Sequence, residues 1–433
     1  MKRIASSLVL MLLVASAWAE ERFPPPDFSP GYVMPATTTP AVRALWLSVL
    51  DVGLLAVALG LTGWAVLVKR SRTATAWIAF GSLVWFGFVR NGCVCSIGSI
   101  QDVAHAGLLG GGLSWVAAAF FLIPLAVALF AGRLFCAGVC PLGAIQDLVL
   151  IKPIKLPPWL EGPLTFLPYV YLTLAVLWAA TGAAYIICSY DPFVGFFRLT
   201  GPASMLIAGG ALLAVATVVG RPYCRFLCPY GVLLSWVSPL AKWQVRIHPT
   251  ACVGCRLCEE SCPFGAMHTP TPTQPRKPSR ALLAGLILAT VPLLALGAWL
   301  GNRAGDTLAR QHATVALADR LLAEDAGTAK GASDAADAVR RHNRAPEEIH
   351  AAAATIVQRT RVGAAIAGGF LVLVLMVGLI RRVGRNRQTT YQADPRACVS
   401  CARCLPACPG DEARPPFPVL AAIAQPQAVK AAP

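Results

Sequence analysis

The stretch Cys252-Val-Gly-Cys-Arg-Leu-Cys-Glu-Glu-Ser-Cys-Pro263 decides how the rest of the chain is interpreted. Its spacing, C-x2-C-x2-C-x3-C-P, is typical of bacterial 4Fe-4S sites, in which three thiolates bind one cubane and the fourth binds a neighbouring cluster. The same spacing returns at Cys398-Val-Ser-Cys-Ala-Arg-Cys-Leu-Pro-Ala-Cys-Pro409. Together the two runs predict a ferredoxin with two 4Fe-4S clusters, interrupted by a long insertion. The candidate ligands are Cys252, Cys255, Cys258, Cys262, Cys398, Cys401, Cys404 and Cys408.

The composition indicates a membrane protein. Of the 433 residues, 56% are hydrophobic and only 13% are charged, which is typical of a chain with many membrane-spanning helices. The net charge of +16 is therefore attributed to lysine and arginine kept on the cytoplasmic side, and no nucleic-acid partner is expected. Fifteen cysteines, most of them in grouped motifs, favour metal ligation. A zinc knuckle or a disulfide knot is the alternative.

The chain is expected to begin with a signal peptide at residues 1–19. Lys2 and Arg3 precede an apolar run, and Ala17-Trp18-Ala19 resembles a cleavage site. An uncleaved signal anchor is the alternative. Residues 20–44, rich in proline, are expected to form a linker outside the membrane.

Seven apolar segments are expected to cross the membrane, since most approach the roughly 20 residues that a spanning helix needs. Lysine and arginine concentrate in the loops that this topology places inside. It makes the chain a multi-pass protein of the cytoplasmic (inner) membrane, surrounded by lipid, with both cysteine runs in the cytoplasm. The segments lie near Leu45–Val68, Ala74–Val89, Leu113–Phe130, Leu164–Ile187, Ala203–Val219, Ala281–Leu300 and Val362–Ile380.

The insertion between the runs predicts a small helical domain on the outer side. Alanine-rich, charged stretches at Thr314–Ala323 and Pro346–Thr360, separated by Gly327–Ser333, indicate amphipathic helices that dock an outer partner. The predicted order is a transmembrane core with duplicated units, the first ferredoxin half, a span, the outer domain, a span, the second half and a disordered tail. These parts occupy residues 45–240, 241–280, 281–300, 301–361, 362–380, 381–412 and 413–433.

The transmembrane core contains a duplication. Gly132-Arg-Leu-Phe-Cys136-x3-Cys140-Pro returns as Gly220-Arg-Pro-Tyr-Cys224-x3-Cys228-Pro, on the same side of the membrane. A cysteine followed by proline suits a helix start, where the macrodipole favours a thiolate. The four cysteines Cys136, Cys140, Cys224 and Cys228 are expected to gather near the inner surface. A further iron-sulfur centre and a structural or disulfide role both remain open for them.

A weaker echo lies on the outer side. Cys95-Ser-Ile-Gly-Ser-Ile-Gln-Asp102 matches the sequence that begins at Cys140, which predicts an inverted repeat. The outer cysteines Cys93, Cys95 and Cys188 are expected to gather opposite the inner four. They predict either a disulfide of Cys188 with Cys93 or Cys95, or a redox centre completed by His105 or Asp191.

Arg133 and Arg221 each follow the first glycine of a duplicated unit. They are expected to be inside-facing anchors whose charged ends reach water, although stabilisation of a nearby thiolate is the alternative.

With two C-x3-C-P units and two ferredoxin runs, the chain resembles the NapH and NosR group of membrane polyferredoxins and, more loosely, the CcoG cupric reductases. The resemblance covers Gly132–Pro263 and Cys398–Pro409. It implies electron transfer between a quinone or a redox partner protein and two clusters. It also implies that Cys408 completes the cluster of Cys252, Cys255 and Cys258, and that Cys262 completes the cluster of Cys398, Cys401 and Cys404. A CcoG-like metal-ion reductase and a membrane redox sensor are the alternatives.

Overall fold

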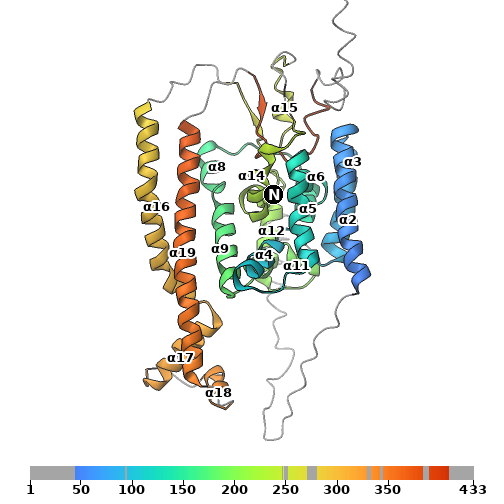
Figure 1. Ribbon diagram of the computed structural model, residues 1–433. Helices are drawn as coiled ribbons and strands as arrows, with labels where there is room; N and C mark the ends of the chain where they lie inside the picture. Colours follow the sequence, from blue (N-terminus) through green and yellow to red (C-terminus); the bar gives the residue numbers. More distant parts are fainter. Residues whose placement is uncertain are drawn as a thin grey trace, which may run out of the picture.

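The computed structural model describes residues 44–92, 95–245, 247, 252–270, 280–328, 333–341, 345–383 and 390–408. The predicted signal peptide, nearly all of the linker, Cys93 and the predicted tail lie outside the described residues. Within the described part, helices dominate and run roughly side by side (Figure 1).

In the first part of the helical core, two helices continue directly into short π-helices, and another helix is nearly all apolar. Its elements are α2 (Leu45–Gly63), η1 (Trp64–Val68), α3 (Arg72–Ser82), η2 (Leu83–Val89), α4 (Ser99–Leu109) and α5 (Trp115–Ala131). The second part holds both copies of the duplicated unit. Its elements are α6 (Leu134–Gly138), α7 (Pro141–Val149), α8 (Pro158–Leu164), α9 (Leu167–Thr181), α10 (Ile186–Tyr190), α11 (Val194–Arg198), α12 (Ala203–Ala216), α13 (Pro222–Phe226), α14 (Pro229–Val237) and η3 (Ser238–Leu240).

The remaining elements comprise the ferredoxin halves and the insertion between them. They are α15 (Leu257–Glu260), β1 (Met267–His268), α16 (Arg280–Ala309), α17 (Ala313–Asp325), α18 (Asp334–Arg341), α19 (Pro346–Val383) and β2 (Gln392–Ala393).

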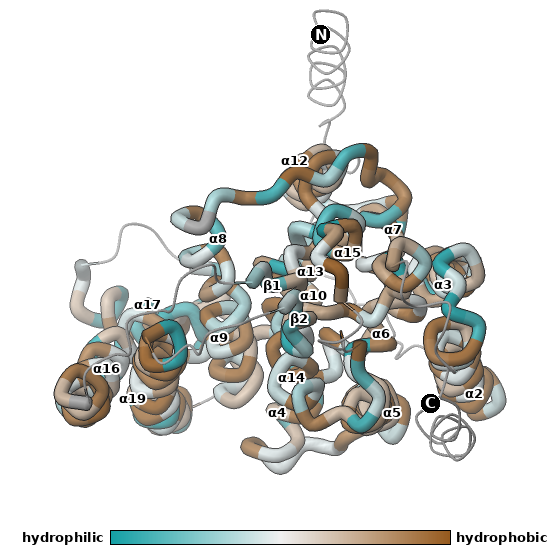
Figure 2. The backbone as a smooth tube through the Cα atoms, turned by 90° about the horizontal axis from the view of Figure 1, so that it is seen from above, coloured by the Kyte–Doolittle hydropathy of each residue, from teal (hydrophilic) through white to brown (hydrophobic). Residues whose placement is uncertain are grey.

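The protein is a multi-pass membrane protein. Among the described residues, four helical stretches are long and apolar enough to span a bilayer. The predicted segments near α5 and α12 are shorter apolar helices, and the segment near Ala74–Val89 is α3 continued by η2. Figure 2 shows α2, α16 and α19 towards the edge of the bundle with largely hydrophobic residues, and Leu50, Leu288 and Leu379 are among their exposed side chains, as expected for helices that face lipid. The four spans are Leu45–Val68, Trp159–Thr181, Ala281–Ala309 and Pro346–Val383.

The two ferredoxin halves meet at one end of the bundle. β1 pairs antiparallel with β2, with Met267 opposite Ala393 and His268 opposite Gln392. The long insertion therefore returns the chain to its starting point, as the even number of crossings predicted. α17 and α18 lie at the other end of the bundle (Figure 1), so the helical domain and the ferredoxin halves are separated by the length of the spanning helices.

α16 and α19 form a tightly packed hairpin. A methyl group at Gly301 would overlap the carbonyl oxygen of Ala364, and one at Gly368 would overlap that of Gly297. Small residues of this kind let two helix backbones approach closely inside a membrane, where dispersion and not water exclusion drives helix association.

The predicted boundary between residues 361 and 362 does not separate two elements. Pro346 opens a helix, as predicted, but that helix continues without a break to Val383. The reason is that no proline follows Pro346 anywhere in the sequence up to Ile380, so nothing breaks the helix where the two predicted segments meet. The small domain is therefore built from α17 and α18 packed on the end of α19, around Val315, Ala318 and Ala353.

Candidate functional site

The two cysteine runs form separate loops with the same backbone conformation. In the first run, Gly254 and Arg256 on either side of Cys255 have positive φ angles of 71° and 67°. In the second run, Ser400 and Ala402 on either side of Cys401 have positive φ angles of 52° and 60°. A left-handed conformation at non-glycine residues is costly. Alternation of this kind turns successive N–H groups inward, which makes a concave site for an anionic group such as an iron-sulfur cluster.

One cysteine of the first run interacts electrostatically with thiols of the second run. Burial raises the pKa of Cys398 to about 11, and the thiols of Cys401 and Cys262 add to the rise. Burial also raises the pKa of Cys404, with Cys401, Cys398 and Cys262 contributing. Cys262 thus lies with the three cysteines of the other run. In the first run, burial raises the pKa of Cys258 and its neighbours Cys252 and Cys255 contribute.

The paired cysteine loops fit iron-sulfur clusters. Among the residues that the structure describes, no three His, Cys, Asp or Glu side chains are close enough to hold one metal ion. A cubane carries its ligands on separate irons and therefore spaces its thiolates more widely than one ion does. The two inward-turned loops and the crossed position of Cys262 suit the wider arrangement.

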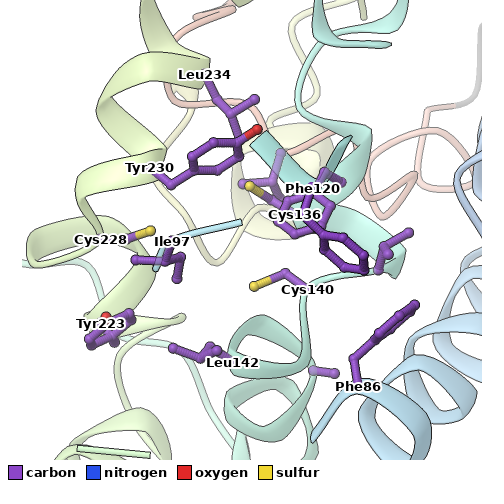
Figure 3. Close-up of a cluster of buried hydrophobic side chains, with 14 of the residues drawn as sticks. Phe86, Ile97, Phe120, Cys136, Cys140, Leu142, Tyr223, Cys228, Tyr230 and Leu234 are labelled. Carbon is purple, nitrogen blue, oxygen red and sulfur yellow. The ribbon is translucent and has the colours of Figure 1, made fainter. Parts of the chain in front are cut away.

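The four C-x3-C-P cysteines come together below the ferredoxin halves, and we call them the inner quartet. The Cys140 thiol interacts electrostatically with the thiols of Cys224, Cys136 and Cys228. Figure 3 shows the sulfurs of Cys136, Cys140 and Cys228 directed into the same space, beside Ile97. Three of the four are buried, and Cys224 is half-buried.

The local sequence explains how these thiols are held. Pro141 and Pro229 occupy the first positions of α7 and α14, directly after cysteines at the helix starts. The Gly231 N–H donates to Cys228 Sγ at 3.3 Å, so the thiol takes the place of the usual capping oxygen. Cys140 occupies the corresponding N-cap position of α7.

Gln146 is a functional candidate that sequence reasoning missed. Its side chain is fully buried, its Nε2 donates to Cys224 Sγ at 3.4 Å, and its Oε1 accepts from Tyr223 N at 3.0 Å. Hydrogen bonds to ligand sulfur tune the potential of a redox centre. The Ile-Gln-Asp triplet shared by both repeats contained the signal that could have found it.

Arg133 and Arg221 are not the water-reaching anchors that the sequence favoured. Arg221 is 1% exposed and Arg133 is 7% exposed, because their partners come from distant parts of the chain. Arg221 pairs with Asp147 at 2.8 Å and donates to the Cys136 carbonyl oxygen. Arg133 donates to the Arg396 carbonyl oxygen at 2.8 Å and lies 4.0 Å from Cys136 Sγ.

Asp147 joins the two parts of the site. Besides Arg221, it pairs with Arg72 at 2.5 Å and lies 3.8 Å from Arg403, which belongs to the second cysteine run. Although burial opposes its ionisation, the Arg221 guanidinium holds the pKa of this carboxyl well below its usual range. One carboxylate therefore ties α7, α3 and the ferredoxin loop together.

The inner quartet lies directly against the ferredoxin halves. A methyl group at Gly132 would contact Ser400 Oγ at 3.2 Å, and one at Gly220 would overlap the backbone of Pro263. Both contacts place the first glycine of a duplicated unit against a residue that adjoins a cluster cysteine. The glycines are required because any side chain would push the two parts of the site apart.

A cavity of about 280 Å³ opens between the bundle and the ferredoxin halves. Its lining combines quartet thiols, aromatic rings and basic groups, with an imidazole and a carboxylate 3.5 Å apart at its ferredoxin edge. Such a mixture is typical of sites for a small organic molecule. Among the lining residues are Cys224, Cys228, Arg133, Tyr169, His268 and Asp394.

Cys95 and Cys188, two of the three predicted outer cysteines, lie beyond the inner quartet, on the side away from the ferredoxin halves. The Gly98 N–H donates to Cys95 Sγ at 3.2 Å, and burial, opposed by this bond, raises the pKa of Cys95, with Cys188 and Asp191 contributing. Cys188 is exposed and Cys95 is half-buried. His105 is not part of this group as described: its Nδ1 lies 3.3 Å from the Ala179 carbonyl oxygen.

Comparison with known proteins agrees with this architecture. A 4Fe-4S binding domain model matches residues 113–156 and 200–248, and a second 4Fe-4S binding domain model matches residues 245–268. No solved structure matches the chain.

Curated relatives cover parts of the chain. YccM of Escherichia coli K12, whose name describes electron transport, is 31% identical over 36% of this chain and 49% of its own. MJ0750 of Methanocaldococcus jannaschii, named as uncharacterized, is 30% identical over 42% of this chain and 77% of its own. The regulatory protein NosR of Pseudomonas aeruginosa is 28% identical over 53% of this chain and 36% of its own. The chain thus spans about half the length of YccM.

Paired C-x3-C-P cysteines lie under two ferredoxin loops, on a bundle of apolar helices, and 4Fe-4S binding domain models match the C-x3-C-P units and the first ferredoxin run. The chain belongs to the family of NapH/NosR-type membrane polyferredoxins with 4Fe-4S domains.

Proposed function

We propose that this protein carries electrons between a membrane quinone and two 4Fe-4S clusters at the cytoplasmic face of the inner membrane. One cluster is held by Cys252, Cys255, Cys258 and Cys408, and the other by Cys398, Cys401, Cys404 and Cys262. The electrostatic interaction of Cys262 with Cys398 and Cys404, across the two runs, is the observation that supports this assignment. When bound, the clusters supply one-electron chemistry, while the chain supplies burial, spacing and hydrogen bonds.

Crossed ligation has a direct test in two single variants. We expect Cys262→Ser to perturb the cluster of the second run, and Cys408→Ser to perturb that of the first, because each cubane loses one thiolate. Low-temperature EPR during a redox titration of anaerobically purified protein distinguishes the two spectra. Identical changes in both variants, or no change in either, would contradict the proposed assignment.

The cavity between the bundle and the ferredoxin halves is the proposed quinone site. Tyr169 on α9 and Ser235 on α14 reach it from spanning or core helices, and Cys228 reaches it from the inner quartet. His268 and Asp394 at its ferredoxin edge supply the proton exchange that two-electron quinone chemistry requires. Arg133 and Arg225 add positive charge that favours the reduced, anionic headgroup.

A bulky side chain in this cavity should block the quinone and leave the clusters intact. We expect Ser235→Trp to slow cluster reduction by a short-chain quinol at least about tenfold while dithionite still reduces the clusters fully. Ser235→Ala is the matched control and should behave as the parent protein. Stopped-flow absorbance measures both rates, and a parental quinol rate in Ser235→Trp would remove the quinone from this cavity.

A further inference from the structure

The outer cysteines sit in a copy of the inner site. Cys140 and Cys228 are the N-caps of α7 and α14, and Cys95 precedes the turn that leads into α4. The sulfurs of Cys95 and Cys228 each accept from the N–H of the glycine three residues later, at Gly98 and Gly231. The inverted repeat is therefore preserved in hydrogen bonds and not only in sequence. Cys95 on one side of the bundle therefore occupies a position equivalent to those of Cys140 and Cys228 on the other side.

Gln101 and Gln146 are equivalent residues of the two repeats and make equivalent hydrogen bonds to the backbone. Gln146 Oε1 accepts from the N–H that precedes Cys224, and its Nε2 donates to the sulfur of Cys224. Gln101 Oε1 accepts from Ile187 N at 2.8 Å, which is the N–H that precedes Cys188. Gln101 is fully buried, and its Nε2 makes no hydrogen bond within the described part of the chain. An unpaired buried amide is costly, and the equivalent amide of the inner repeat, that of Gln146, donates to a cysteine sulfur.

Cys95 and Cys188 are close neighbours. A methyl group at Gly98 would lie 3.3 Å from Cys95 Sγ and 3.4 Å from Cys188 Sγ, so both sulfurs rest against the same Cα. Cys188 is exposed and Cys95 is half-buried behind it. An accessible thiol with a second thiol at its back is the arrangement required for thiol-disulfide exchange.

A buried carboxylate accompanies the pair. Asp191 is 4% exposed. It lies three residues after Cys188 and directly before a proline, much as Cys228 lies four residues after Cys224 and directly before a proline. It accepts from Phe193 N at 2.8 Å and from the Tyr223 hydroxyl at 3.1 Å. Burial raises the pKa of Asp191 to about 6, which suits a group that takes up a thiol proton near neutral pH.

The outer pair is connected to the inner quartet through the core. Cys95 and Cys140 line the same small internal cavity, together with Phe86 and Phe120. The Tyr171 phenol interacts electrostatically with Cys95 and Cys188 on one side and with Cys228 on the other. Cysteines therefore lie at intervals across the packed centre of the bundle, from the ferredoxin loops through the inner quartet to Cys188.

We propose that Cys95 and Cys188 form a redox-active dithiol that passes electrons from the two clusters, across the inner quartet, to a disulfide of a partner protein, on the side where α17 and α18 lie. The inference rests on the proposed electron transfer by the clusters and names the class of acceptor at the far end of the chain of thiols.

The exchange conserves atoms and electrons. The Cys188 thiolate attacks the partner disulfide, and one partner thiol leaves. Cys95, after losing its proton to Asp191, attacks the mixed disulfide, so that a Cys95–Cys188 bond forms and the second partner thiol leaves. The partner has gained two electrons and two protons. Two electrons, one from each reduced cluster, and two protons from water then break the Cys95–Cys188 bond and restore the dithiol.

The test uses the full chain in detergent, in a Cys93→Ser background that leaves only two outer thiols. The protein is reduced anaerobically with dithionite, freed of excess reductant and mixed with 5,5′-dithiobis(2-nitrobenzoate) as the disulfide. We expect release of about two thiolates per exchange, loss of the reduced-cluster EPR signal, and a Cys95–Cys188 bond in the peptide masses.

Three variants separate the steps. Cys188→Ser should slow oxidation of the clusters by the disulfide at least about tenfold, whereas Cys95→Ser should stop at a mixed disulfide on Cys188. Gly98→Ala keeps both thiols but pushes their sulfurs aside, and should slow exchange without altering the clusters. Gly98 has φ −64°, so alanine adds no backbone strain. Ser189→Ala, next to Cys188, is the unaffected control.

The outcomes distinguish the two proposals. An iron-free chain would overturn the proposed function and, with it, this inference. Clusters that are intact but are oxidised equally fast in Cys188→Ser, or a parent protein without a Cys95–Cys188 bond, would overturn this inference alone.

Discussion

At the scale of single residues, the site is organised by buried charges and amides as much as by cysteines. Arg221 is enclosed because Asp147 neutralises it, and Gln146 orients Cys224 because both of its amide atoms are used. Removing one partner from such an arrangement leaves a buried group unpaired, which usually costs more than the pair contributes.

Asp147→Asn should therefore be severely destabilising. Loss of its charge leaves Arg221 buried without a counter-ion, and the expected loss of stability is about 3–5 kcal/mol. Thermal unfolding in detergent should show this loss, together with release of iron, since Arg403 is also freed. Asp102→Asn in the matching position of the outer repeat is the control, because Asp102 lacks such a set of arginines in the described part of the chain. Equal stability of the two variants would refute the role assigned to Asp147.

At the scale of elements, the small domain carries a pH-sensitive helix start. His312 caps α17, and its Nδ1 accepts from Thr314 N at 3.1 Å. Only a neutral imidazole accepts in this way, and burial lowers the pKa of His312 below its usual range. Because the folded-state pKa is the lower one, this stabilisation is complete above the ordinary pKa and is lost as pH falls through the folded value.

Acidification should accordingly loosen α17. We expect the amide protection factors in α17, taken relative to the intrinsic exchange rate at each pH, to be smaller below about pH 6 than near neutrality, by an amount matching a capping contribution of about 1 kcal/mol. His312→Asn keeps a capping group that does not titrate, and should remove this pH dependence. If exchange in the asparagine variant shows the same pH dependence, some other group is responsible.

Much of the whole molecule was predictable because its patterns are strictly periodic or strictly spaced. The apolar segments and the repeated cysteine runs predicted a membrane bundle with two ferredoxin halves that meet, and β1 and β2 join them. Burial of Arg221 could not be predicted, since its partner Asp147 is distant in sequence. The uninterrupted α19 was hidden by the change from polar to apolar residues along one helix.

Placement of the outer cysteines was predictable only in part. The match between the segments that begin at Cys95 and Cys140 indicated an inverted repeat, but it did not show that Ile97 inserts beside the inner quartet (Figure 3). That contact depends on how α4 packs against α9 and α5, which no local pattern in the sequence specifies.

The central claim is that two complete 4Fe-4S clusters sit on this membrane bundle, and iron and acid-labile sulfide content with low-temperature EPR tests it most directly. Anaerobically purified protein should contain about eight irons and about eight sulfides per chain. A Cys136, Cys140, Cys224 and Cys228 quadruple serine variant should keep about eight, and any iron lost in it would reveal a further centre at the inner quartet. About four irons in the parent protein, or zinc in place of iron, would contradict the account.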